Sequence, residues 1–397
     1  MKIVDRFLDL ISFDTKSDPD SSTYPSAQSE LLFADKLVDI LKEEGVENAY
    51  KDEFGIVYAR VDLGKEETIG LIAHMDTAPD LDGGIKNPRI IKNYDGKEIV
   101  LDENYTMRDE DFPWLKTLVG EDIIVTDGKH LLGGDDKAGI AIILEFLNYF
   151  LKNKEEFKYN LAIAFTPDEE IGKGALHFDC KKMNADVAYT LDGGPIFEAN
   201  YENFNAAHAK LNIKGIGVHP GSAKDIMINA ALLASEFISM LPPKMTPAHT
   251  EGHEGFIHLT DINGTCEEAT LEFILRDHDL DLLEQKKIIL METMSKLEVK
   301  YPKAKFKLSI GDDYRNMFDY FKKDMHAIDL INKAYLNKNV KISYTPIRGG
   351  TDGATITYLG LPCPNLGVGD YSPHGRFEIV SISQMNEMVD ILKELYK

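Results

Sequence analysis

The chain has 397 residues, 43% hydrophobic and 28% charged, which is the composition of an ordinary globular protein of two or three domains. Its formal charge of −23 opposes binding to nucleic acid, which needs clustered lysine and arginine, and to anionic membranes. No apolar run approaches the roughly 18 residues of a membrane span. Three cysteines are too sparse for a disulfide framework or a thiolate zinc site, so we expect a cytoplasmic protein.

The first half of the chain, to about residue 206, alternates between strand-like and helical runs. An amphipathic helix opens it, with charges where a signal peptide would stay apolar. The predicted strands are 56–61, 68–73, 122–126, 160–166 and 187–191, and the predicted helices lie around 27–44 and 136–152. This alternation predicts an α/β fold, with a largely parallel or mixed sheet covered by helices on both faces.

The middle of the chain, about 207–316, has the pattern of a separate inserted unit. Its strands are predicted near 208–215, 255–262, 269–276 and 305–310, and its helices at 229–241 and 281–300. The order β-α-β-β-α-β is the ferredoxin-like split motif, with a turn expected at Asn263-Gly264. Such a unit is a candidate lid or dimerisation domain, and the α/β domain around it is expected to span 1–206 and 317–397.

A long segment at about 78–121 interrupts the α/β pattern. Its acidic residues include Asp102, Glu103, Asp109, Glu110 and Asp111. They precede FPWL at 112–115, which contains the only tryptophan of the chain. Segments of this length in compact domains are usually functional or disordered. The acids either face a cationic group of a substrate or form solvated surface, and the sequence favours neither.

Five side chains of the kinds that bind metals lie in separate short segments. They are His74 in LIAHMDT, Asp135 in GGDDKAG, Glu170 in TPDEEIG, Asp192 in TLDGG and His374 in YSPHG. Most of these segments follow a predicted strand or form a glycine-rich turn, and open α/β sheets bind ligands outside the carboxyl ends of their strands. Two histidines with three carboxylates suit a pair of Zn²⁺, Co²⁺ or Mn²⁺ ions better than a structural zinc.

The HMD segment places His74 and Asp76 two residues apart, so their side chains point the same way on an extended backbone. An aspartate there can accept the second N–H of the imidazole and make its metal-binding nitrogen more basic. A lone histidine is more often satisfied by neighbouring backbone. The position directly after an apolar strand favours the metal-binding interpretation.

The GGDDKAG segment contains Asp135 and Asp136 after two glycines that allow close backbone approach. One carboxylate can bridge two cations about 3.5–4 Å apart, which is the spacing of two-metal hydrolases. An aspartate before a helix is also a common N-cap. Asp136 is expected to be that cap, which leaves Asp135 as the ligand.

The DEE triplet at 168–170 places neighbouring carboxylates at a strand end, where they repel one another unless cations are close. Glu170 can then bind a metal, while Glu169 takes a proton from a metal-bound water whose pKa falls from about 16 to about 7. Alone, the triplet would suit an exposed acidic pair at a helix start. That interpretation loses weight beside the other segments.

The chain closely resembles the M20 metallopeptidases, and among them the aminotripeptidases, which remove the N-terminal residue of tripeptides. The motifs that carry the resemblance occur in order: HMDT, GGDDKAG, TPDEEIGKGA, LDGG, VHPGSAK, RGGTDGA, LPCPNLGVG and SPHG. Each motif is a weak signal, but together they cover nearly the whole chain. The resemblance implies a zinc-exopeptidase-like catalytic domain with the ferredoxin-like lid inserted.

The resemblance also implies roles for the candidate ligands. Asp135 would bridge two zinc ions, for which cobalt or manganese are possible substitutes. His74 and Asp192 would complete the shell of one ion. Glu170 and His374 would complete the shell of the other.

Further residues receive roles in the same way. Asp76 would orient His74, and Glu169 would be the general base and then the acid. His219 in VHPG, from the inserted domain, would polarise the scissile carbonyl, which requires the lid to close. The positions that resemble substrate-binding residues are Arg276 and Arg348, whose guanidinium groups could grip a peptide carboxylate. The family usually carries an aromatic residue where this chain has His278.

The predicted activity is that of a dizinc aminopeptidase acting on small peptides, with tripeptides preferred. A related dipeptidase or N-acyl amino acid deacylase would use the same metals. A tripeptidase is distinguished from these by its requirement for a free α-ammonium and its rejection of N-acetylated peptides. We hypothesise that the acids of 78–121 recognise the free ammonium. A metal-binding scaffold without catalysis should lack Glu169 or a ligand, and all are present. A homodimer would form through the inserted domain, although nothing in the sequence demands it.

Overall fold

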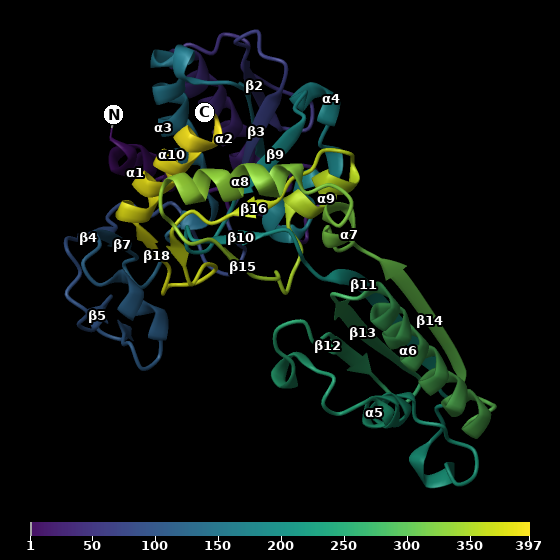
Figure 1. Ribbon diagram of the computed structural model, residues 1–397. Coiled ribbons are helices and arrows are strands. Elements are labelled where there is room, and N and C mark those ends of the chain that lie inside the picture. The colour runs from purple at the N-terminus through teal and green to yellow at the C-terminus, as the bar shows by residue number, and fades with distance from the viewer. Residues whose placement is uncertain (1) are drawn as a thin grey trace. The chain divides into compact units, whose positions relative to one another are not determined.

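The computed structural model describes residues 2–397 and contains two compact units (Figure 1). Unit 1 is built from Met1–Tyr201, Asp319–Thr345 and Thr351–Lys397. Unit 2 is built from Glu202–Phe318 and Pro346–Gly350. The chain therefore passes between the units four times.

The short segment Pro346–Gly350 belongs to unit 2, whereas the boundaries expected from the sequence placed it in the α/β domain. Arg348 explains the difference, because its guanidinium donates hydrogen bonds to the backbone oxygens of Gly252, Glu254 and Thr250 at 2.7, 2.9 and 3.2 Å. Ile347 also forms an isolated parallel bridge with Asn203. Such long-range contacts leave no trace in the local sequence pattern.

An eight-stranded mixed sheet forms the centre of unit 1, in the order β1-β2-β8-β3-β9-β16-β10-β15. The strands are β1 Tyr50–Lys51, β2 Val57–Val61, β3 Thr68–His74, β8 Asn160–Thr166, β9 Val187–Leu191, β10 Glu198–Asn200, β15 Ser343–Tyr344 and β16 Asn365–Leu366. The four central strands β8, β3, β9 and β16 run parallel. All residues of β3, β8 and β9 are buried, as expected for parallel strands covered on both faces.

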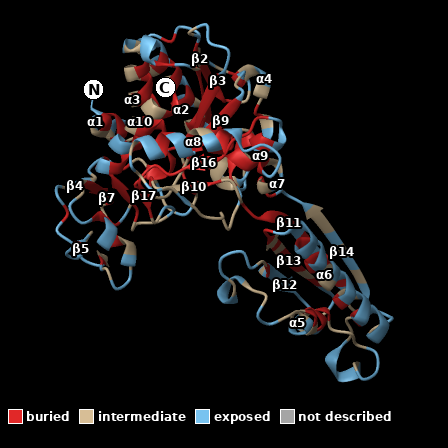
Figure 2. Cartoon of the chain, viewed as in Figure 1, coloured by how far each residue is buried: buried red, intermediate tan, exposed pale blue. Residues whose placement is uncertain are grey.

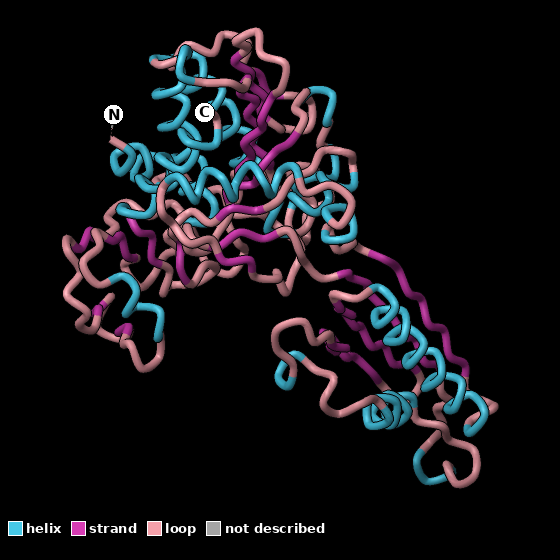
Figure 3. Tube along the Cα trace, viewed as in Figure 1, coloured by secondary structure: helices cyan, strands magenta, loops and turns pink. Residues whose placement is uncertain are grey.

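Helices cover both faces of this sheet (Figures 2 and 3). The helices of unit 1 are α1 Ile3–Ile11, α2 Gln28–Glu43, α3 Gly134–Lys152, α4 Cys180–Met183, α8 His326–Asn337, α9 Asp352–Tyr358 and α10 Ile382–Leu395. The short α7 Phe318–Phe321 lies where the chain returns from unit 2 to unit 1. Phe178 and Met183 near α4 and Ile356 of α9 pack with Ile72 of β3 in one apolar cluster. Within residues 2–397, every helix is too short or too polar to cross a lipid bilayer.

A second sheet of unit 1 has the order β17-β18-β7-β4 and joins the 78–121 insertion to the C-terminal part of the chain. Its strands are β4 Arg89–Ile91, β7 Ile123–Val125, β17 Asp370–Tyr371 and β18 Ile379–Ser381, and a two-stranded ribbon is formed by β5 Ile99–Val100 and β6 Thr106–Met107. Strands β17 and β18 form an antiparallel hairpin. The insertion is therefore ordered and contributes strands of its own.

Unit 2 has the predicted order β11-α5-β12-β13-α6-β14, and its sheet order is β12-β13-β11-β14. The elements are β11 Asn205–Lys214, α5 Ala230–Met240, β12 Phe256–Gly264, β13 Glu268–Asp277, α6 Leu280–Lys300 and β14 Lys305–Asp312. Asn229 and Asp279 cap the two helices through their side chains. One face of the sheet buries Leu211, Leu271 and other apolar residues against these helices. The predicted α/β class with a ferredoxin-like insertion is confirmed.

The predicted hairpin turn at Asn263-Gly264 is wrong, because both residues belong to strand β12 and pair with Thr270 and Ala269. The turn lies three residues further on, where the Thr265 amide donates to the Glu268 carbonyl at 2.7 Å. A Cβ at Gly264 would lie only 2.9 Å from that of Ala269. Close approach of neighbouring strands, rather than a turn, accounts for this glycine.

Candidate metal centre

Three of the candidate ligands lie at the carboxyl ends of neighbouring parallel strands. His74 is the last residue of β3 and stands opposite Thr166, the last residue of β8. Glu170 follows β8 in the short 3₁₀-helix Glu169–Ile171, and Asp192 directly follows β9. Parallel strands end at the same edge of a sheet, so these side chains meet there.

Asp135 enters the same place from the irregular first residues of α3. Gly133 adopts a left-handed conformation with φ 77°, and Asp135 itself has non-helical backbone angles. One carboxylate oxygen of Asp135 lies 2.9 Å from Nε2 of His74. The other lies 3.3 Å from Nε2 of His374. Two imidazoles from opposite ends of the chain therefore share one carboxylate.

The remaining two carboxylates complete two groups around Asp135. Asp192 lies 3.7 Å from Nε2 of His74, and Glu170 lies 2.9 Å from Nε2 of His374. The ligand atoms of His74, Asp135 and Glu170 all lie within 4.8 Å of one another. A second such group consists of His74, Asp136 and Asp192. The structure thus brings all five predicted residues together, with Asp192 beside His74 and Glu170 beside His374.

The buried carboxylates of this cluster need positively charged partners nearby. Although burial opposes it, hydrogen bonds to Asp135, Asp192 and Asp76 hold the pKa of His74 well above its ordinary value. Hydrogen bonds to Asp135 and Glu170 raise the pKa of His374 to about 11. Burial and the nearby Asp135 raise the pKa of Glu170 to about 7. Divalent cations bound here would supply the positive charge that these carboxylates need.

The donor set fits a pair of divalent cations. It offers two imidazoles and three carboxylates, with Asp135 able to contact both ions. One oxygen of Glu170, Oε1, is buried and has no hydrogen-bond partner among the described residues. A buried carboxylate oxygen without a donor is costly, and a cation removes that cost. The side chain of His374 is 49% exposed, against 3% for His74, so solvent reaches the centre from the His374 side.

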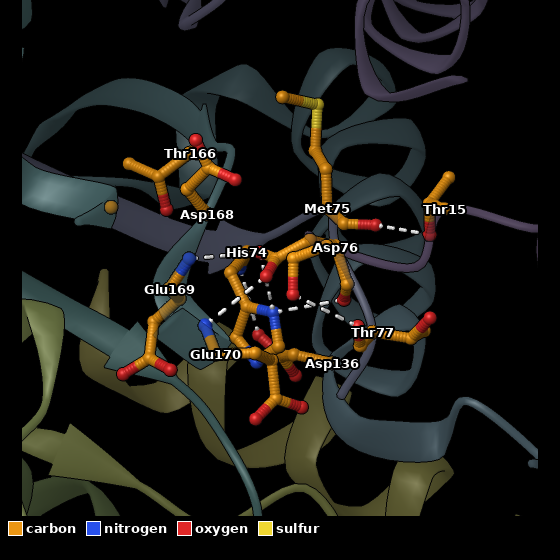
Figure 4. A network of polar contacts seen from close by, with 12 residues as sticks. Thr15, His74, Met75, Asp76, Thr77, Asp136, Thr166, Asp168, Glu169 and Glu170 are labelled. Atoms are coloured by element: carbon orange, nitrogen blue, oxygen red, sulfur yellow. Dashed lines mark hydrogen bonds and ion pairs between the residues drawn. The ribbon is translucent and has the colours of Figure 1, made fainter. Parts of the chain in front are cut away.

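Asp76 holds the backbone of the DEE turn as well as the histidine (Figure 4). Its two carboxylate oxygens accept the amide N–H groups of Glu169 and Glu170 at 2.9 and 3.1 Å. Nδ1 of His74 lies 3.1 Å from the Asp76 backbone oxygen and 3.4 Å from its carboxylate. The expected contact between Asp76 and the imidazole is present, and the grip on the backbone is an addition that the sequence did not predict.

Replacement of Asp76 by alanine is expected to lower kcat/KM by about 10–100-fold, because the turn that presents Glu169 and Glu170 loses both of its anchors. Steady-state kinetics with a tripeptide measures this effect. The control is Thr77→Val, since the neighbouring Thr77 hydroxyl is buried without a partner and contributes no hydrogen bond among the described residues. Equal rates for the Asp76→Ala variant and the parent protein would refute the anchoring role.

Glu169 lies beside the cluster without a hydrogen bond from its carboxylate among the described contacts. Burial, and then the negative charge of Asp192, raise the pKa of the Glu169 carboxyl well above its ordinary value. Its amide is held by Asp76, so its position is set from the backbone.

Asp136 and Lys137 take structural positions around the centre. Asp136 accepts the amide of Gly139 at 3.1 Å, as expected of a cap, and also the amide of His74 at 3.2 Å. The ammonium of Lys137 donates to the Thr15 hydroxyl at 2.8 Å, and that hydroxyl donates to the carbonyl of Met75 at 2.8 Å. Burial lowers the pKa of Lys137 to about 8. Both residues tie the start of α3 to the HMD segment.

Several buried acids near the centre escaped the sequence analysis. They are Glu30, Asp352, Asp370 and Glu378, and Asp168 of the DEE triplet is buried as well. Burial raises the pKa of each of them. They occur at no recognisable spacing. The one available signal was an acid next to a strand-like run, as Glu378 is in FEIVSI.

The 78–121 insertion packs against the hairpin that leads to and from His374. The ring of Trp114 stacks on Tyr371 with centroids 5.0 Å apart, and Phe112 contacts Phe377 at 5.1 Å. Two of the insertion's acids form local contacts. Asp102 accepts the amides of Asn104 and Tyr105, and Asp109 pairs with Lys116 at 3.2 Å.

The three predicted substrate-binding residues lie in unit 2. His219 is exposed, and its Nδ1 accepts the amide of Gly221 at 3.1 Å. Arg276 donates to the carbonyls of Ala207 and Leu275 and lies 3.7 Å from Asp313. Arg348 holds the 250–254 segment, as described above. Both guanidinium groups are thus engaged with their own unit.

The ring of His278 lies among other aromatic rings. Its ring lies 4.3 Å from that of Phe204 and 4.8 Å from that of His253. Burial lowers the pKa of His278, which favours the neutral form of the imidazole. A neutral imidazole can pack here as an aromatic ring would.

Comparisons with known proteins show to which family the chain belongs. Residues 201–304 match the peptidase dimerisation domain of the M20 family, and residues 118–230 match the M42 glutamyl aminopeptidase family. Peptidase T of Halothermothrix orenii is 45% identical over 99% of this chain and 98% of its own length. The chain belongs to the peptidase T family of M20 metallopeptidases. Members of this family are metal-dependent aminopeptidases, and the chain is accordingly a hydrolase.

Solved structures show the same fold at lower sequence identity. The aminopeptidase PepT of Bacillus cereus has a TM-score of 0.77 and 20% identity, covering 100% of this chain and 97% of its own. The YXEP protein of Bacillus subtilis, described as a dinuclear metal-binding peptidase of the M20 family, has a TM-score of 0.66 and 13% identity, covering 99% and 96%. The predicted recognition of the family is confirmed.

Proposed function

We propose that this member of the peptidase T family is a cytoplasmic dizinc aminotripeptidase that hydrolyses the first peptide bond of tripeptides. The single observation that carries the proposal is the Asp135 carboxylate, whose two oxygens face His74 and His374 at 2.9 and 3.3 Å. A carboxylate shared in this way is what a two-cation centre requires. The three cysteines are free thiols, which supports a reducing compartment.

The chain's own residues would hold the cations in two groups. His74, Asp192 and one oxygen of Asp135 would bind the first. Glu170, His374 and the other oxygen of Asp135 would bind the second. Zinc is the proposed native ion, with cobalt or manganese as substitutes. When bound, such cations acidify the attacking water and withdraw electron density from the scissile carbonyl.

Glu169 would act as general base and then as general acid. Its carboxylate would accept a proton from the attacking water and return it to the leaving amine nitrogen as the peptide bond breaks. Asp76 supports this role, because it fixes the Glu169 backbone next to that of Glu170. The proposed base Glu169 would thereby be held beside the proposed metal ligand Glu170.

Unit 2 would supply the remaining contacts to the substrate. His219 would donate to the scissile carbonyl oxygen, and Arg276 and Arg348 would receive the C-terminal carboxylate of the peptide. The peptide carboxylate would accept hydrogen bonds from the N–H groups of these arginines that do not already donate to backbone oxygens, or it would replace those backbone contacts. We propose in addition that unit 2 acts as a lid and pairs two subunits, which the match to a dimerisation domain supports.

The amino end of the substrate distinguishes this proposal from a dipeptidase or a deacylase. We propose that an acidic group, most simply one of the insertion's carboxylates, binds the free α-ammonium. Free tripeptides should then be cleaved at least about 10²-fold faster than their N-acetylated forms, because blocking removes a charged partner.

A panel of di-, tri- and tetrapeptides, free and acetylated, tests the proposal when assayed with zinc, cobalt and manganese. Preferred cleavage of free tripeptides supports an aminotripeptidase. Faster cleavage of dipeptides supports a dipeptidase, and cleavage of acetylated amino acids supports a deacylase. Absence of cleavage with every metal would favour a scaffold without catalysis and refute the proposal.

A further inference from the structure

A buried carboxylate from the hairpin of His374 holds the turn that presents Asp135. Glu378 is 1% exposed and lies directly before strand β18. Its Oε2 accepts the amide of Gly133 at 2.9 Å, and its Oε1 accepts the amide of Asp135 at 3.1 Å. One side chain therefore bonds to the backbone on both sides of Gly134.

The turn around Gly134 packs closely against the hairpin formed by β17 and β18. A Cβ on Gly134 would overlap Val380 and would lie 2.9 Å from Oε1 of Glu378. Glycine is thus required at 134 for the two segments to approach. The two amides donate to the two oxygens of this one side chain, which ties the turn to the hairpin.

The same hairpin presents His374, only four residues before Glu378. The segment therefore places one candidate ligand directly and a second, Asp135, through the Glu378 carboxylate. Both oxygens of Glu378 accept backbone N–H groups, so this side chain supports the centre instead of joining its donor set. The distance of 3.3 Å between His374 and Asp135 depends on how these two segments are held together.

We propose that Glu378 is a positioning residue that fixes the shared carboxylate of Asp135 relative to His374 and thereby sets the affinity for both cations. The proposal rests on the two-cation centre described above. Outer partners of metal ligands commonly contribute about 10–100-fold to metal affinity. Glu378 acts on the one ligand that both cations share, so its loss should weaken both ions.

The test measures metal binding instead of turnover. The parent protein and the variants Glu378→Ala and Glu378→Gln are stripped of metal, and zinc affinity is then measured by competition with a chromophoric chelator. Glu378→Ala should bind zinc about 10–100-fold more weakly. Glu378→Gln should be intermediate, because its amide oxygen can accept only one of the two N–H groups.

A matched control is a glutamate that contacts the same hairpin from another segment of the chain. Glu121 accepts hydrogen bonds from Ser381, the last residue of β18, and from Gln384, but it makes no contact with the Asp135 turn among the described hydrogen bonds. Glu121→Ala should leave zinc affinity within about threefold of the parent. The melting temperature of each metal-free variant, followed by circular dichroism, separates loss of stability from loss of affinity.

Two results would overturn the proposal. The first is parent-like zinc affinity in Glu378→Ala and Glu378→Gln, even with a lower metal-free melting temperature, since that result describes a purely structural residue. The second is an equal loss of affinity in Glu121→Ala. If Glu378→Ala does not fold, Glu378→Gln decides between the outcomes. Failure of the parent protein to bind zinc would instead refute the metal centre itself.

Discussion

Replacement of Glu169 by glutamine should lower kcat for tripeptide hydrolysis by about 10²–10⁴-fold, because a general base of this kind typically contributes that much. Glutamine has the same shape but cannot accept and return a proton. The amide of residue 169 would still donate to Asp76, so Glu170 keeps its place. Metal content and KM should therefore change little, and stopped assays of released amino acid measure the loss.

The control for this variant is Glu155→Gln, an exposed glutamate that precedes β8, whereas Glu169 follows the other end of that strand. It should retain the parent rate. A Glu169→Gln variant that binds its cations and hydrolyses tripeptides at a near-parent rate would rule out Glu169 as the base. Loss of metal together with activity would instead assign Glu169 to the ligand set.

Replacement of Asp135 by alanine should remove the cations themselves. The carboxylate contacts both imidazoles of the centre, and no other side chain among the described residues contacts both His74 and His374. Without it, each cation would keep two protein ligands instead of three. The two imidazoles would also lose the carboxylate that they share. Elemental analysis after dialysis should show metal falling from two ions per chain toward zero, with hydrolysis lost.

The matched control is Asp127→Ala, an aspartate on the preceding segment that bonds to His130 at 2.7 Å outside the centre. It should keep its metal. An Asp135→Ala variant that still holds two ions per chain would show that the cations bind without a shared carboxylate. The two-cation arrangement would then have to be abandoned.

Much of the fold follows from local pattern. The runs at 68–73, 160–166 and 187–191 are continuously apolar and β-branched, and they form the buried parallel strands β3, β8 and β9. Strand ends in such sheets converge, so the meeting of His74, Glu170 and Asp192 was predictable. That Asn263-Gly264 form no turn was not predictable from the sequence. These residue types favour turns in general, and only the register of β12 with β13 excludes a turn here.

The sequence by itself determined which residue types are present and at which strand ends they stand, because those depend on neighbours along the chain. Only the tertiary structure decided that Asp135 lies between His74 and His374, that Glu378 grips its turn, and that the insertion packs on Tyr371. The physical reason is distance along the chain. A side chain that bonds to backbone some 240 residues away leaves no periodic signal, and its partner exists only once both segments have folded against each other.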